Sequence, residues 1–325
     1  MRRLTFQSLT AASLALLLAA AAACGSGSST SSSSGGSGGT EKVTVGVIPI
    51  LDVAPIYLGK EKGFFARHGI DLTLESGQGG AAIVPGVISG QFQFGFSNVT
   101  SLLLAADKKL PLKVVAAGNS STGQAGSDFS EVVVKGDSPI RSAKDLAGKT
   151  VAVNTLKNIG DTTVRESIRK AGGDPKDVKF VELAFPDMPA AVANGRVDAA
   201  WVVEPFVSVA KSQGDRVVAS NLVDTAPSLM ISAYFTSKQL QQSNPDLVKK
   251  FTDAINESMQ YADSHPDEAR NIITTYTKID PALLPKLTLP KWPTQINRDS
   301  TQKLADLAQQ DGLISNKADL SALLP

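Results

Sequence analysis

The sequence predicts an α/β protein of two lobes with a cleft between them, each lobe a mostly parallel sheet flanked by helices. From Val43 onward, short apolar runs typical of buried strands alternate with runs of helical periodicity. This alternation is the pattern of a parallel sheet covered by helices on both faces. The pattern then recurs, because Gly90 and Gly195, which each close a predicted helix, lie 105 residues apart.

The first predicted lobe opens with a buried strand over 43–48. A helix over 54–66 follows and stops before Gly69, a residue type that suits the left-handed position after a helix. The remaining segments continue the alternation, with strands over 71–75, 91–96 and 112–116 and a helix over 80–89.

The second predicted lobe repeats this order. Its segments are strands over 150–153, 178–181 and 196–201, and helices over 161–171 and 187–194. Asp161 is expected to cap the first of these helices. If the repeat reflects only the general likeness of two βαβ units, two successive α/β lobes are still predicted.

The last third of the chain is predicted to be helical, because strand signals stop after Tyr234. Helices are expected over 244–262 and 298–311, and another begins at His265-Pro266. We expect them to pack back on the first lobe. The lobe limits are then 41–125 plus 233–325 for lobe 1 and 126–232 for lobe 2, and the two connections between the lobes form a hinge.

The amino-terminal segment resembles a bacterial lipoprotein signal peptide. Arg2 and Arg3 precede an apolar run over 9–23, and Cys24, the only cysteine, is followed by sixteen Gly, Ser and Thr residues. We expect a signal peptide over 1–23, a lipidated Cys24 and a disordered tether over 24–40. Ala21 stands where such a box usually has Leu. The expected location is extracytoplasmic, on the outer face of the cell membrane, held through the lipid anchor only.

Other interpretations of this segment fit less well. The apolar run is shorter than the ~20 residues that a transmembrane helix needs. Cys24 has no second cysteine for a disulfide. A catalytic thiol needs a fixed geometry, which a tail of Gly, Ser and Thr does not provide.

Composition places the rest of the chain among ordinary globular proteins, with 42% hydrophobic and 19% charged residues. Removal of the signal peptide leaves 30 of the 32 basic side chains beside 31 acidic ones. This balance gives no electrostatic reason to expect nucleic acid or an anionic membrane face as a partner.

Small polar residues gather at the predicted strand ends. In open α/β sheets, ligands bind outside the carboxyl ends of the strands. The candidate ligand-binding residues at these ends are Asp52, Gln78, Ser97, Asn98, Asn119, Asn154, Thr155, Asp187 and Glu204. Each of them alone is also explained as a helix cap. The helix starts at Gly79-Gly80 and Gly160-Asp161 offer free N–H groups to a polar or anionic ligand.

Four segments resemble the solute-binding proteins for nitrate, sulfonates, taurine and thiamine precursors. They lie at 55–72, 89–94, 145–153 and 194–200, and the likeness covers 43–209. Gln93 stands where the family usually has Asp. The resemblance implies a type II periplasmic-binding-protein fold without a cofactor or metal, a monomer that delivers a small molecule to the permease and ATPase of an ABC importer.

Enzyme functions find little support in the residues. A relaxed phosphate-loop pattern at 143–150 precedes a strand, whereas a true phosphate loop follows one. His68 and His265 lie beside helix ends rather than strand ends, which disfavours a triad or a metal site. The alternatives that remain are an enzyme on the same fold, such as a thiamine-precursor synthase or a lyase, and a ligand-sensing receptor subunit.

The ligand class is only weakly indicated. The candidate residues include three carboxylates and no Arg, and Lys157 is the nearest base. This favours a neutral or cationic ligand, such as a nitrogen heterocycle bound by Glu204 and Asn98. A sulfonate or nitrate held by helix N-termini is the alternative. Planar ligands could stack on aromatic side chains that are otherwise explained as core, namely Tyr57, Phe185, Trp201 and Phe206.

Overall fold

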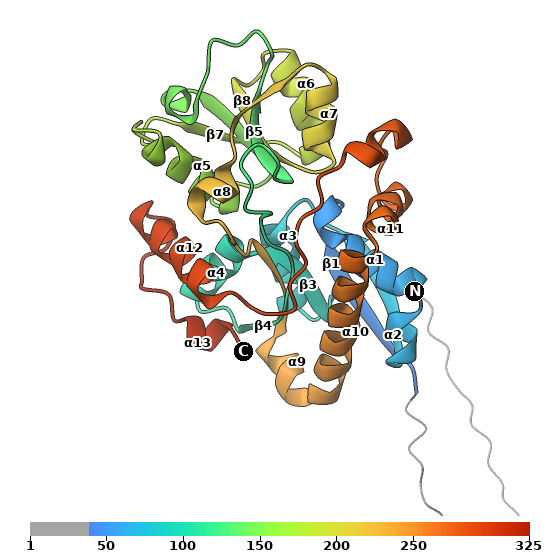
Figure 1. The fold of residues 1–325 in the computed structure, drawn as a ribbon. Coiled ribbons are helices and arrows are strands. Elements are labelled where there is room, and N and C mark those ends of the chain that lie inside the picture. The colour runs from blue at the N-terminus through green and yellow to red at the C-terminus, as the bar shows by residue number, and fades with distance from the viewer. Residues whose placement is uncertain (1–38) are drawn as a thin grey trace, which may run out of the picture. The chain divides into compact units, whose positions relative to one another are not determined.

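The computed structural model describes residues 39–325, which form two α/β lobes, each built on a five-stranded sheet. Figure 1 shows the first sheet, with β1, β3 and β4, below the second, with β5, β7 and β8. The predicted fold class is confirmed. The predicted signal peptide, Cys24 and all but the last two residues of the predicted tether lie outside the described residues.

The first sheet has the strand order β2-β1-β3-β10-β4. Its strands are β1 (Glu41–Val47), β2 (Ile70–Ser76), β3 (Phe94–Asn98), β4 (Leu112–Ala117) and β10 (Ser232–Ser237). β1 pairs in parallel with β2 and β3, and β10 lies antiparallel between β3 and β4. The sheet is therefore mostly parallel, with a single reversed strand.

The second sheet has the order β7-β6-β8-β5-β9 and the same pattern of directions. Its strands are β5 (Ser130–Val134), β6 (Thr150–Val153), β7 (Lys179–Glu182), β8 (Ala199–Val203) and β9 (Arg216–Ala219). Here β5 is the reversed strand. In each sheet, the reversed strand is the first strand after the chain arrives from the other sheet.

The internal repeat extends to single contacts. Val45 pairs with Phe94 in the first sheet, and Val151 pairs with Ala199 in the second. The Gln93 side chain accepts from the Thr44 N–H at 2.8 Å, and the Asp198 carboxylate accepts from the Thr150 N–H at 2.8 Å. Gln93, which departs from the family pattern, thus makes the same strand-edge hydrogen bond as the Asp of the second lobe.

The helices cover both sheets and supply the connections. Their bounds are α1 (Ala54–Glu61), α2 (Phe64–Arg67), α3 (Gly80–Ile88), α4 (Val99–Asp107), α5 (Ile159–Lys170), α6 (Met188–Ala193), α7 (Phe206–Ser212), α8 (Asn221–Thr225), α9 (Lys238–Ser243), α10 (Pro245–Ser264), α11 (Pro266–Asn271), α12 (Arg298–Gln310) and α13 (Leu320–Leu323). The short 3-10 turns are η1 (Leu51–Val53), η2 (Ala143–Leu146), η3 (Phe185–Asp187), η4 (Ile272–Thr275) and η5 (Pro281–Lys286).

Three details differ from the sequence prediction. The helix expected over 54–66 is two helices, because Gly63 between them adopts a φ of 75°. Asn158, not Asp161, caps α5, and its side chain accepts from the Gly160 N–H at 2.9 Å. Three strands, β5, β9 and β10, are absent from the prediction, and β10 continues past Tyr234 to Ser237.

The carboxyl-terminal third packs on the elements around the first sheet. The apolar face of α10 lies against α1 and α2, and Phe251 stacks on Phe94 of β3 with ring centroids 3.8 Å apart. Gly59 of α1 allows this close approach, because a Cβ there would lie 1.9 Å from the Ser258 hydroxyl oxygen. The predicted lobe limits at 125 and 232 remain a prediction.

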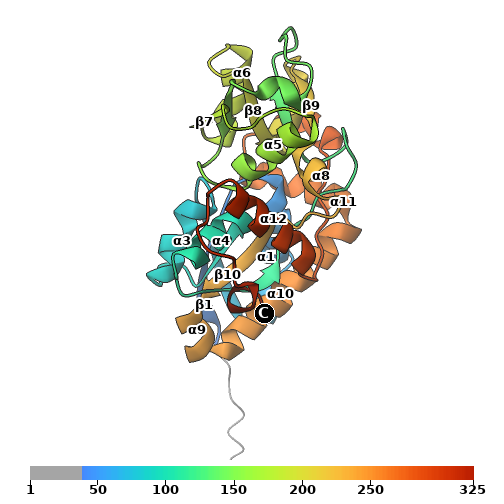
Figure 2. The ribbon, with the colours of Figure 1, turned by 90° about the vertical axis from the view of Figure 1, so that its left-hand side faces the viewer.

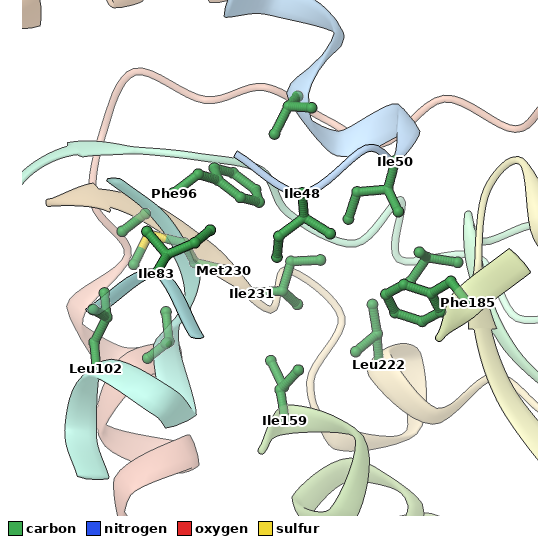
Figure 3. Close-up of a cluster of buried hydrophobic side chains, with 14 of the residues drawn as sticks. Ile48, Ile50, Ile83, Phe96, Leu102, Ile159, Phe185, Leu222, Met230 and Ile231 are labelled. Carbon is green, nitrogen blue, oxygen red and sulfur yellow. The ribbon is translucent and has the colours of Figure 1, made fainter. Parts of the chain in front are cut away.

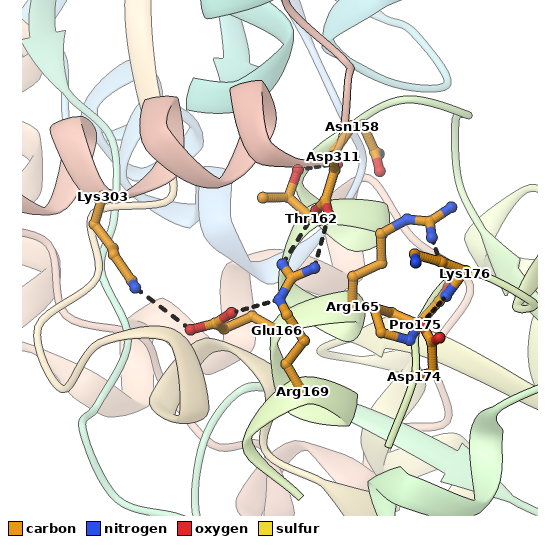
Figure 4. A network of polar contacts seen from close by, with 10 residues as sticks. All are labelled: Asn158, Thr162, Arg165, Glu166, Arg169, Asp174, Pro175, Lys176, Lys303 and Asp311. Atoms are coloured by element: carbon orange, nitrogen blue, oxygen red, sulfur yellow. Dashed lines mark hydrogen bonds and ion pairs between the residues drawn. The ribbon is translucent and has the colours of Figure 1, made fainter. Parts of the chain in front are cut away.

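Helix α12 contacts elements of both lobes, namely α4 and α5. In Figure 2, α12 crosses in front of α4, below α5. The Arg169 guanidinium of α5 binds the Asp311 carboxylate through two hydrogen bonds of 2.7 and 3.2 Å, and it also pairs with Glu166 at 3.0 Å. Lys303 of α12 lies 3.4 Å from Glu166 (Figure 4). These contacts tie the carboxyl-terminal third to the second lobe.

Two chain segments cross between the sheets, 118–129 after β4 and 226–231 before β10. They run side by side, since the Ser121 N–H donates to the Leu229 carbonyl at 3.0 Å. A third segment joins them at Lys291, which exchanges two backbone hydrogen bonds with Ser120.

Within residues 39–325, no helix has the length and apolar composition that a bilayer-spanning segment needs.

Candidate ligand pocket between the sheets

A pocket lies where the strand ends of the two sheets face each other. Figure 3 shows Ile48, Ile50 and Phe96 from the first lobe, Ile231 from the crossing segment before β10, and Ile159, Phe185 and Leu222 from the second lobe. The remaining lining residues are Asp52, Asn98, Asn154, Trp201, Val203 and Ser232. The site thus occupies the position that open α/β sheets use for ligands.

The free volume of this pocket is only about 30 Å³. That volume holds roughly one or two water molecules. The walls therefore leave no room for an organic molecule in this arrangement.

Hydrogen bonds across the pocket mouth hold the lobes in contact. The Asn154 amide donates to the Gln78 carbonyl at 3.1 Å, and the Gln78 amide donates to the Asn154 carbonyl at 3.3 Å. The Leu51 N–H donates to the Glu204 carbonyl at 3.0 Å. These contacts join loops after β1 and β2 to loops after β6 and β8, so the two lobes are in contact here.

Asp52 is the charged residue of the pocket lining, and it is 4% exposed. Its Oδ1 accepts from the Asn119 amide at 2.8 Å, and Asn119 is itself hydrogen-bonded to Ser232. Its Oδ2 has no hydrogen-bond partner among residues 39–325. Burial raises the pKa of Asp52 to about 7, because desolvation disfavours the charged carboxylate.

The carboxyl-terminal third holds the loop that carries Asp52. The Trp292 indole N–H donates to the Asp52 carbonyl at 3.0 Å, and the Tyr276 hydroxyl donates to the Ile50 carbonyl at 3.2 Å. Trp292 belongs to a second apolar cluster between α1 and the segments after α10. Elements far along the chain therefore fix the position of this carboxylate.

The candidate residues Asn98 and Asn154 line the pocket but already bind protein groups. Asn98 caps α4, accepting from the Ser101 N–H at 2.9 Å. Asn154 accepts from the Asn158 amide at 2.6 Å. The cap interpretation of Asn98 is therefore confirmed, whereas a ligand contact by either amide remains a prediction.

Asn119, Ser97, Thr155 and Gln78 lie around the pocket without lining it. Asn119 supports Asp52, and Gln78 closes the mouth. The Ser97 hydroxyl donates to the Asn98 carbonyl at 3.1 Å, and the Thr155 hydroxyl accepts from the Asn158 amide at 3.0 Å. In this arrangement, these four residues therefore contact neighbouring protein groups and do not face the free volume of the pocket.

Asp187 and Glu204 are not in the lining of this pocket, and a ligand contact by either carboxylate remains a prediction. Asp187 is exposed at the end of η3. Glu204 is buried, but its carboxylate accepts from the Ser208 N–H at 3.0 Å and from the Thr288 N–H at 3.2 Å. Burial raises the pKa of Glu204 to about 7.

The apolar walls were not predicted as site residues. Ile48, Ile50 and Ile231 look in the sequence like any buried strand residue. Phe185 and Trp201 do line the pocket, in edge-to-face contact with centroids 5.4 Å apart. Tyr57 instead stacks on Tyr276 outside it. The sequence feature that could have identified these wall residues is their position at strand ends, next to polar residues.

An outer hollow of about 380 Å³ lies next to the pocket. Pro49 and Pro186, which line it, adjoin the pocket residues Ile50 and Phe185. Phe206 lines the hollow too, with its ring parallel to that of Phe185 and the ring centroids 6.2 Å apart.

Within residues 39–325, no group of three or more His, Cys, Asp and Glu side chains is placed to hold a metal ion.

Two similar sheets joined by crossing segments, with a pocket at their facing strand ends, define the class of two-lobed binding-protein folds. A sequence profile described as NMT1/THI5 like matches residues 51–269. The chain belongs to the NMT1/THI5-like family. The family indicated by the sequence motifs is thereby confirmed.

Relatives are similar to the chain in sequence, and a solved structure shares its fold. The chain is 26% identical to a binding protein of Brucella abortus over 81% of this chain and 79% of that one. It is 25% identical to the taurine-binding periplasmic protein of Escherichia coli, over 70% and 69% of the two chains. The alkanesulfonate-binding protein SsuA of Xanthomonas axonopodis has the same fold, with a TM-score of 0.74 at 16% identity over 87% of this chain and 98% of that one.

Proposed function

We propose that this chain is the extracytoplasmic solute-binding subunit of an ABC-type importer, anchored to the membrane through lipid on Cys24. It captures a small organic molecule between its lobes and presents it to a permease and an ATPase. The observation that carries the proposal is the buried pocket at the facing strand ends, in a family whose relatives are named as binding proteins. The protein acts as a monomer and without a cofactor.

Capture requires a hinge motion in this proposal. The free volume of about 30 Å³ excludes an organic molecule until the lobes part. The crossing segments 118–129 and 226–231 are the natural hinge, because they are the short links between the sheets. Opening breaks the Gln78–Asn154 hydrogen bonds, and contacts of the two lobes with the ligand replace them.

In this proposal, the protein binds the captured ligand without converting it chemically. Asp52 is the one titratable side chain among the described residues that line the pocket. General acid–base catalysis commonly needs a second positioned proton donor or acceptor, which the lining does not supply. This supports a binding protein over a synthase or lyase on the same fold.

The test is ligand-dependent stimulation of the importer. The molecule that copurifies with the full-length protein is identified by native mass spectrometry, and the permease and ATPase are reconstituted in liposomes. ATP hydrolysis should rise several-fold only when protein and ligand are both present. Ile159→Trp, which fills the pocket, should abolish the rise, whereas Leu156→Trp at a 46% exposed position should preserve it.

Two results would contradict the proposal. One is conversion of the ligand to a product by the purified protein alone, which indicates an enzyme. The other is equal stimulation by the Ile159→Trp variant, which places the ligand outside the pocket.

A further inference from the structure

The charge balance of the pocket sets it apart from a site for anions. Asp52 brings a carboxylate, and none of the described lining residues is Arg, Lys or His. An anion inside this lining would meet a like charge in a desolvated space, without a cation to offset it. The lining is otherwise apolar, apart from two Asn and one Ser.

Protein groups bind some of the N–H donors at the helix starts that could hold an anion. The Asn158 side chain accepts from the Gly160 N–H of α5, and the Asp161 carboxylate accepts from the Lys157 N–H, just before that helix, at 2.8 Å. Asn98 takes the Ser101 N–H of α4. The start of α3 has no side-chain cap, but the side chains of Thr155 and Asn154 pack closely against Gly79 there. A Cβ on Gly79 would lie 2.7 Å from the Thr155 methyl.

Asp52, in contrast, has a carboxylate oxygen that is free to accept a hydrogen bond. Asn119 fixes one carboxylate oxygen at 2.8 Å, while the other is buried without a partner in the part of the chain that the structure describes. A buried acceptor of this kind costs free energy until a donor reaches it. A cationic N–H donor satisfies it and supplies the missing counter-charge at the same time.

We propose that the pocket takes an apolar molecule that carries a protonated amine or other cationic N–H group, with that group on Asp52, and that it rejects sulfonates and nitrate. This inference rests on the proposed binding function and names its ligand class. Phe96, Phe185 and Trp201 enclose the apolar body of the molecule. The outer hollow beside Phe185 gives room for a larger substituent.

Three probes with one benzene ring and different polar groups test the class. Benzylamine, benzyl alcohol and benzenesulfonate are titrated calorimetrically into the full-length protein in detergent at pH 8. Benzylamine should bind at least tenfold more tightly than benzyl alcohol, and benzenesulfonate should give no saturable heat. Tightest binding of benzenesulfonate overturns the proposal, and so does a failure of all three probes to bind.

The matched variants Asp52→Asn and Asp263→Asn locate the effect. Asp52→Asn keeps an acceptor for Asn119 but removes the charge, so the preference for benzylamine should fall at least tenfold. Asp263→Asn removes an exposed carboxylate of α10 that lines neither the pocket nor the outer hollow, and it should change nothing. An unchanged preference in Asp52→Asn would refute the assignment of the cationic group to this residue.

The pH dependence of the unaltered protein gives a readout that needs no variant. Asp52 neighbours Tyr57, Tyr234 and Tyr276, whose raised pKa values keep them neutral, and the Asp128 carboxylate. Because the pKa of Asp52 is about 7, benzylamine affinity should rise about tenfold from pH 6 to pH 8. Affinity that falls over this range would mean that protonated Asp52 donates to the ligand. Product formation from a probe would instead refute the binding function and leave the charge preference intact.

Discussion

Asp52 and Glu131 show how burial with few or no partners changes a carboxyl group. Both oxygens of Glu131, the second residue of β5, have no hydrogen-bond partner among residues 39–325, and the residue is fully buried. Desolvation raises the pKa of Glu131 to about 8. Its protonated form therefore predominates at neutral pH, and this uncharged form fits among the valines of the strand.

Glu131→Gln should remove a pH-dependent loss of stability. A carboxyl whose pKa is raised on folding contributes stability that is fully present below the ordinary pKa of 4.5 and is lost as the pH rises through about 8. At pH 5 the variant and the unaltered protein should unfold at similar denaturant concentrations. At pH 9 the variant should be more stable by a few kcal/mol. Equal stability of the two proteins at pH 9, measured by urea unfolding, would show that Glu131 is not desolvated.

Single residues also show where sequence reasoning stops. Asp52, Asn98 and Asn154 were predicted from their place after strands, and they do line the pocket. Glu204 has the same place after β8, yet it does not line the pocket. Its carboxylate accepts hydrogen bonds from Ser208, four residues on, and from the Thr288 N–H, 84 residues distant. A local sequence pattern could not predict the Thr288 contact.

At the scale of elements, α10 packs on the helices and strands of the first lobe. Its apolar stripe of Leu247, Phe251, Ile255 and Met259 is buried, as the helical spacing predicts.

The short apolar runs of β5 and β9 explain why the sequence did not predict these strands. β9 has only four residues, and β5 begins with Ser130 and Glu131 before three valines, so neither has the longer apolar run of a typical buried strand.

Phe251→Ala should destabilise the protein by about 3–5 kcal/mol, the usual cost of emptying a fully buried phenylalanine site. The ring is lost from its stack on Phe94, 3.8 Å away. Lys249→Ala on the exposed face of the same helix is the control and should cost less than about 0.5 kcal/mol. Similar unfolding midpoints for the two variants would show that α10 is not anchored through Phe251.

Arg169→Met should weaken the hold of α12 on the second lobe. The Asp311 carboxylate, whose side chain is 7% exposed, then loses both hydrogen bonds from the guanidinium. We expect faster hydrogen exchange in α12 and a lower thermal midpoint, because a buried charge is left without its partner. Arg196→Met, at an exposed position of the second lobe, is the control. Unchanged exchange in α12 would mean that apolar packing alone holds this helix.

At the scale of the whole molecule, short motifs and the internal repeat predicted the family and the two-lobed fold. The sequence did not predict the role of the carboxyl-terminal third, because this part of the chain acts through contacts with residues that are far away in the sequence. Trp292 and Tyr276 hold the loop before α1, and α12 spans both lobes. The proposed hinge therefore has to move with these contacts in place or break them.

Cys24→Ser tests the anchor separately from the site. Because the anchor and the pocket are independent in our proposal, the variant should leave the membrane fraction and bind ligand with unchanged affinity. The measurements are cell fractionation and calorimetry of the released protein. A loss of affinity would make the lipid part of the binding site, and continued membrane association would exclude Cys24 as the anchor.

A crystal structure of the protein with the ligand that copurifies with it tests the central claim most directly. The account predicts ligand density between Phe96 and Phe185, lobes that lie farther apart than in the arrangement described above, and a ligand nitrogen within hydrogen-bond distance of the Asp52 oxygen that has no protein partner among residues 39–325. Density at another surface, or an anionic group at the start of α3 with Asp52 left unpartnered, would contradict it.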